Sequence, residues 1–110
     1  MPFKLIVSNT VLVPVKGVIN DAAGKSSPFS FSLTCQRLNA DELKEALSSS
    51  DTLVGDVVAR VAQDWSGVLD EEGQPVAYSD LALKQLLNIP GVAALCFGAY
   101  IQAVGAKEKN

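Results

Sequence analysis

The densest group of side chains suited to chemistry is a run of three acids, Asp70, Glu71 and Glu72. Carboxylate oxygens are the ligands that hard cations prefer, so the run is a candidate cation site or the acidic part of a small enzyme site. The acids are adjacent and are followed by Gly73, however, and this is not the spacing of a calcium-binding loop. Neighbouring side chains in a hairpin also alternate between faces. We therefore interpret the run as a solvated turn.

The chain offers few other reactive groups. Its two cysteines, Cys35 and Cys96, lie far apart in apolar stretches without an adjacent histidine or basic residue, so we expect buried free thiols. The chain has no histidine, which excludes His-based triads and the common zinc sites within one chain. The sequence therefore predicts a protein that is not an enzyme and that binds no cofactor or metal.

Length and composition indicate one compact domain. The chain has 110 residues, of which 48% are hydrophobic and 19% charged, and its net charge is −3. No basic patch interleaved with aromatic residues is present, so we expect no binding of nucleic acid. The start, Met1 to Lys4, lacks the pattern of a secretory signal, and we expect a cytoplasmic protein. We place the domain at residues 1–106 and a short charged tail at 107–110.

The first half begins with strand patterns. Apolar side chains recur at every second position over Val11–Ile19 and Phe29–Cys35, and turn-forming residues lie between them at Asn20–Lys25. This pattern predicts an antiparallel hairpin. Pro14 places its strand at a sheet edge because proline has no N–H to donate. Phe3–Val7 is a candidate for a further strand.

Helical signals follow the hairpin. Asn39 and Glu42 have the spacing of a capping box, which predicts a helix over Ala40–Leu47. Two adjacent apolar rows over Leu53–Trp65 predict a longer amphipathic helix that packs on the sheet, with Trp65 plugging the end of the core.

The remaining elements are a small hairpin and two more helices. Two short extended pieces flank the acidic turn, Ser79 caps a third helix, and Pro90 suits the first position of a final helix. The predicted fold class is α+β, with an N-terminal antiparallel β-hairpin sheet followed by about four helices and a small second hairpin.

The final helix, Gly91–Ala106, is apolar on all sides. Apart from the Tyr100 hydroxyl, Gln102 is its one polar side chain, and the segment is shorter than the roughly 20 residues that span a bilayer, so we expect no membrane insertion. Glycine recurs every seventh residue at Gly91, Gly98 and Gly105, which makes a smooth strip for a second helix.

Both a central core helix and an interface helix fit this pattern, and we expect homo-oligomers. The candidate contact residues are Val92, Leu95, Cys96, Ala99, Tyr100 and Ala103 along one side, and Gly98 and Ile101 along another.

Several segments in order resemble the small tail assembly chaperones of long-tailed phages and prophages. They are the strands at Val13–Gly17 and Phe29–Leu38, the tryptophan segment Val61–Val68, the acidic turn and helix start Asp70–Ser79, and the leucine pair Leu86-Leu87. The resemblance covers nearly the whole chain.

This resemblance implies a non-catalytic role in the bacterial host cytoplasm. Proteins of this family bind the helical tape measure protein and keep it soluble until tail tube subunits polymerise around it. In this family a frameshift often gives a minor, longer product that recruits the tube subunit, so the resemblance also implies the tube protein as a candidate second partner. Glu108–Asn110 are residues that an adenine-rich run of codons can encode, and such a run can shift the reading frame. The alternative interpretation is an ordinary solvated tail. The alternative functions are a structural tail completion or terminator subunit, which stays in the virion, and a host protein-binding adaptor module.

Overall fold

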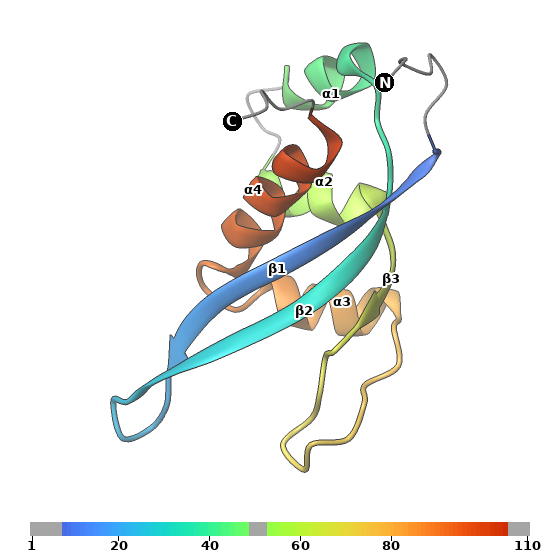
Figure 1. Ribbon diagram of the computed structural model, residues 1–110. Helices are drawn as coiled ribbons and strands as arrows, with labels where there is room; N and C mark the ends of the chain where they lie inside the picture. The colour runs from blue at the N-terminus through green and yellow to red at the C-terminus, as the bar shows by residue number, and fades with distance from the viewer. Residues whose placement is uncertain (1–7, 49–52, 106–110) are drawn as a thin grey trace, which may run out of the picture.

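The computed structural model describes residues 8–48 and 53–105. Over these residues the chain is α+β, with an antiparallel sheet in the order β1-β2-β3 and four helices (Figure 1). This confirms the predicted fold class. The elements, in chain order, are β1 (Thr10–Asn20), β2 (Ser26–Gln36), α1 (Ala40–Leu47), α2 (Val54–Val61), β3 (Ala62–Ser66), α3 (Asp80–Leu87) and α4 (Val92–Val104).

The predicted hairpin is present and longer than its apolar pattern. β1 and β2 pair along their whole length, from Thr10↔Gln36 to Asn20↔Ser26. β1 is an edge strand, as Pro14 predicts. In Figure 1 this ribbon crosses the molecule diagonally, and its turn lies well away from the helices. The predicted strand Phe3–Val7 and the tail with its candidate slippery run, 107–110, lie outside the described residues.

The turns of the large and the small hairpin share one hydrogen-bond pattern. Asp21 Oδ1 accepts from the backbone N–H groups two and four residues ahead, both at 2.9 Å. Asp70 Oδ1 accepts from the equivalent groups at 2.9 and 3.0 Å. Each turn is completed by a glycine with φ of +79°, Gly24 or Gly73, a conformation that costs other residues energy. The acidic run is therefore a turn, and Asp70 is engaged in holding it.

The start of α1 follows the capping-box prediction. Asn39 Oδ1 accepts from the Glu42 N–H at 2.8 Å, and Glu42 Oε1 accepts from the Asn39 N–H at 3.1 Å. These bonds satisfy two donors that a helix end otherwise leaves free.

The predicted helix over Leu53–Trp65 is wrong in its second half. α2 ends at Val61 and the chain continues directly as β3, with Trp65 paired to Leu33. Trp65 also donates its indole N–H to the Val76 carbonyl at 2.8 Å, and its ring meets Tyr78 edge to face at 5.3 Å. Sheet pairing and these contacts outweigh the local helical pattern.

α4 also begins differently from the prediction. Pro90 precedes the helix, and Gly91 is the N-cap with φ of +86°. This left-handed residue turns the chain sharply, so that α3 and α4 meet at 106°.

The core lies between the sheet and the helices. α4 packs along β1 and against α2, while α2 also touches α3. α2 therefore packs mainly on helices, and its buried side chains Val58 and Val61 still join the cluster formed by the strands. The core residues are Val13, Val15, Phe31, Leu33, Cys35, Leu38, Val58, Val61, Val92, Cys96 and Tyr100, with Trp65 packed against them.

Candidate protein-binding surface

The structure divides the predicted contact residues of α4 into a core face and an outward face. Val92, Cys96 and Tyr100 are at most 5% exposed and belong to the core, so they cannot form a contact surface on the folded chain. Leu95 and Gly98 are exposed. The remaining three, Ala99, Ile101 and Ala103, are half-buried.

Two polar contacts fix the rotation of α4 about its axis. The Tyr100 hydroxyl donates to the Gln36 carbonyl at 2.7 Å and accepts from the Leu38 N–H at 3.0 Å. Arg37 Nη1 donates to the carbonyl of Val104, in the last turn, at 3.2 Å, where a cation also complements the helix dipole. Burial raises the pKa of Tyr100, which keeps the phenol in its donating form.

With this rotation, α4 turns its smoothest side outward. A Cβ built on Gly98 would meet no atom within 4 Å, so nothing in the described part of the chain covers this side of the helix at its middle. The outward face consists of Gly91, Ala94, Leu95, Gly98, Ile101, Gln102 and Gly105, of which all but Ile101 are exposed. It contains no ionisable side chain.

Leu95 joins this outward face to the hairpin. A Cβ on Gly17 would lie 2.9 Å from Leu95 Cδ1 and 2.7 Å from Phe29 Cζ, so the missing side chain of Gly17 is what lets both groups approach β1. The Phe29 ring in turn stacks with Phe31 at 6.1 Å. Leu95 remains 41% exposed. The apolar surface of α4 therefore continues onto the hairpin.

The free edges of the sheet are poor sites for strand addition. Pro14 lies on β1, and Pro28 lies on β2 opposite Val18, four residues further along β1. Along an antiparallel strand, backbone N–H groups point alternately toward the partner strand and away from it, so positions 14 and 18 of β1 point the same way. Both prolines therefore occupy positions whose N–H would point away from the β1–β2 pair. β3 pairs only with Ser32–Cys35, so the Pro28 end of β2 is open on that side. Proline on an open edge interrupts pairing with another strand.

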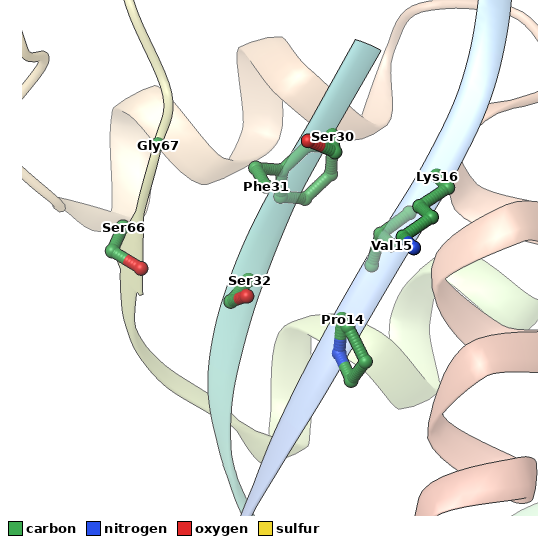
Figure 2. Close-up of a pocket in the computed structure, with 8 residues that line it drawn as sticks. All are labelled: Pro14, Val15, Lys16, Ser30, Phe31, Ser32, Ser66 and Gly67. Carbon is green, nitrogen blue, oxygen red and sulfur yellow. The ribbon is translucent and has the colours of Figure 1, made fainter.

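The face of the sheet opposite the helices carries a shallow hollow of ≈ 270 Å³. Figure 2 shows Lys16 and Pro14 on β1, Ser30 and Ser32 on β2, and Ser66 beyond them. Lys16 is the one ionisable group among its lining residues, and no hydrogen bond joins its amine to the hydroxyl of Ser30, Ser32 or Ser66.

The thiols are poor nucleophiles in the folded chain. Burial raises the pKa of Cys35 and of Cys96 to about 11, and the neighbouring Cys96 adds to the shift of Cys35. Both are free, as the sequence predicts. Residues 8–48 and 53–105 contain no group of three or more His, Cys, Asp or Glu side chains placed to hold a metal ion.

Sequence reasoning missed two members of the outward face, Ala94 and Gln102. Their signal is their spacing, since each lies four residues from Gly98 and therefore on the same side of the helix. An apolar helix hides this signal because hydropathy does not separate its faces.

Within the described ranges, no single helix is both long and apolar enough to cross a membrane. α3 and α4 pass the length and composition criteria only as a pair, and that pair is bent by 106°.

Comparison of the chain with known protein families, curated proteins and solved structures gave no match.

Proposed function

We propose that this protein is a non-catalytic assembly chaperone that binds the tape measure protein of a phage or prophage tail in the bacterial host cytoplasm. The observation that carries the proposal is the outward face of α4, which is uncharged, is apolar except for Gln102, and is exposed to solvent at every position but Ile101. Exposed apolar faces of this kind are typical of protein-binding sites.

The shape of the face suits a helical partner. Ala94 and Gly98 present almost no side chain, so the backbone of a second helix can approach closely. Leu95 and Ile101 flank this smooth centre and can pack against an apolar stripe on the partner. A tape measure protein is a long helical protein that presents such stripes before the tail tube surrounds it.

The rest of the molecule supports binding rather than catalysis. In the hollow on the sheet no hydrogen bond couples Lys16 to a serine, and both thiols are buried. The prolines on the sheet edges disfavour recruitment of a partner by strand pairing. The resemblance of the sequence to tail assembly chaperones supplies the identity of the partner.

The test is co-expression of this chain with the large helix-rich protein encoded next to it, followed by pull-down and sizing. We expect the two proteins to co-purify in soluble form. We expect Gly98→Leu to lower the yield of the complex at least tenfold, because the added side chain fills the smooth centre of the face. Gln85→Leu adds a leucine at an exposed position of α3 and is the matched control. An insoluble neighbour that never co-purifies, or equal loss in both variants, would contradict the proposal.

A second measurement separates the chaperone from a structural tail subunit. We expect mass spectrometry of mature particles to detect tube and tape measure proteins without this chain. Its presence in the particle at stoichiometric amounts would favour a completion or terminator subunit instead.

A further inference from the structure

We propose that, in the absence of a partner, a second copy of this chain covers the outward face of α4, with the two α4 helices antiparallel across a two-fold axis at Gly98. The inference uses the same surface as the proposed function but does not depend on the identity of the partner.

The positions of the outward face are arranged symmetrically about Gly98, the middle residue of Val92–Val104, and the residue types match at three and at seven residues from it. Three residues to either side stand Leu95 and Ile101, two apolar side chains of the same size. Four residues to either side stand Ala94 and Gln102. An antiparallel pair with its axis at Gly98 therefore sets Leu95 of each copy against Ile101 of the other, and this contact is self-complementary, as a two-fold interface requires.

The same symmetry extends to the ends of the helix. Gly91 and Gly105 are seven residues from Gly98 on either side, and both are exposed caps of α4. Small residues at the centre and at both ends allow the two helices to lie close along their whole length.

Gly98 has no function within a single chain that the structure can account for. A Cβ there would touch nothing, and glycine destabilises the middle of a helix relative to alanine. A second helix that crosses closely at this position would need the absence of a side chain. Close contact between copies therefore gives this residue a physical role.

Charge favours this face over the rest of the surface for self-association. Each copy carries a net charge of −3, so two copies repel one another in general. The outward face of α4 has no ionisable side chain, whereas the acids of the turn at Asp70–Glu72 and Asp41 in the first turn of α1 are exposed elsewhere. Contact through α4 buries apolar area without bringing two acidic groups together.

Disulfide trapping tests the geometry. Both native thiols are buried, so an introduced cysteine is the accessible thiol, and the unaltered chain serves as the blank. We expect Gly98→Cys to form a covalent dimer under mild oxidation, because a disulfide needs Cα atoms within about 7 Å. Gln85→Cys, an exposed position on α3, should remain monomeric.

The direction of the helices is tested with a mixed pair. Ala94→Cys and Gln102→Cys should cross-link with each other when mixed and only weakly when oxidised alone. Strong cross-linking of Ala94→Cys with itself would indicate parallel helices and overturn the antiparallel arrangement.

Sedimentation velocity of the unaltered chain, without oxidant, completes the test. We expect a monomer–dimer equilibrium whose dissociation constant rises at least tenfold in Gly98→Leu and stays unchanged in Gln85→Leu. A monomer at every concentration, together with no cross-link at position 98, would overturn the inference. That result would leave co-purification with the tape measure protein intact, whereas a dimer that fails to co-purify would count against the proposed function alone.

Discussion

The Tyr100 hydroxyl accepts a hydrogen bond from the backbone N–H of Leu38 at 3.0 Å and donates one to the backbone carbonyl of Gln36 at 2.7 Å. One side chain of α4 therefore satisfies two backbone groups where β2 ends and the chain turns toward α1. The same contact sets which face of α4 points outward, and so the proposed binding surface depends on a buried phenol.

Removal of this hydroxyl should destabilise the protein. Tyr100→Phe leaves the Leu38 N–H and the Gln36 carbonyl without their partner, and we expect a loss of about 1–3 kcal/mol in the free energy of unfolding. Tyr78→Phe is the matched control, because Tyr78 makes one hydrogen bond, to the Ala62 carbonyl, and we expect a loss of about 0.5–1.5 kcal/mol. Urea denaturation measures both. An equal loss of unfolding free energy in the two variants would show that the two hydrogen bonds of Tyr100 stabilise the fold no more than the single one of Tyr78.

Alkaline pH should destabilise the folded chain through its thiols. Burial raises the pKa of Cys35 and Cys96 from 9.0 to about 11, so the unfolded chain releases these protons first as pH rises. The contribution of the thiols is fully present below pH 9 and is lost progressively between about pH 9 and 11.

Urea denaturation across this window measures the effect. We expect a shallower decline in the double variant Cys35→Ala/Cys96→Ala, with a remainder from the tyrosines, whose pKa values are also raised. An identical slope in the two proteins would assign the decline to other groups.

Alanine at two glycines of α4 should have opposite effects. Gly98 is helical with open space around it, so Gly98→Ala should raise the free energy of unfolding by about 0.5–1 kcal/mol. Gly91 has φ of +86°, so Gly91→Ala should lower it by about 1–2 kcal/mol. Thermal unfolding at high dilution, where association does not contribute, measures both. Destabilisation by Gly98→Ala under these conditions would mean that the position is covered within the monomer.

The acids of the small hairpin should differ in importance. Asp70→Ala should cost about 1 kcal/mol, because two backbone N–H groups lose their acceptor. Glu71→Gln and Glu72→Gln should each stay within about 0.5 kcal/mol of the unaltered chain, since both are exposed. We also expect no rise in Tm on addition of Ca²⁺. A rise that both glutamine variants abolish would identify the turn as a cation site.

Local patterns sufficed to predict much of the fold. The alternation over Phe29–Cys35 and the Asn39–Glu42 capping box depend on neighbours within a few residues, and the structure confirms both. The two aspartate turns were also legible as turns, although their shared hydrogen-bond pattern was not predicted.

The error at Val61–Trp65 has a non-local cause. Apolar residues at Val57, Val61 and Trp65 fit a helix, and no neighbour in sequence signals a break. The helix ends because Trp65 pairs with Leu33, a residue far away along the chain. Such a partner is visible only once the sheet is assembled.

The candidate binding surface could be predicted only in part for the same reason. The sequence indicated α4 and the glycine strip, but an apolar helix does not reveal which side it buries. That choice is made by the hydrogen bonds of Tyr100 at the end of β2 and by the contact of Arg37 with Val104. Both partners of each contact come from distant parts of the chain.

The prolines on the open sides of β1 and β2 have a consequence for the protein at high concentration. A chain whose hydrophobic hairpin stands partly clear of its helices, with Val18 66% exposed and Ile19 47% exposed, is a candidate to seed fibrils. Pro14 and Pro28 each remove a backbone donor from the edge on which the next molecule in a fibril would grow. The two prolines therefore disfavour the growth of fibrils by strand pairing when the protein is concentrated.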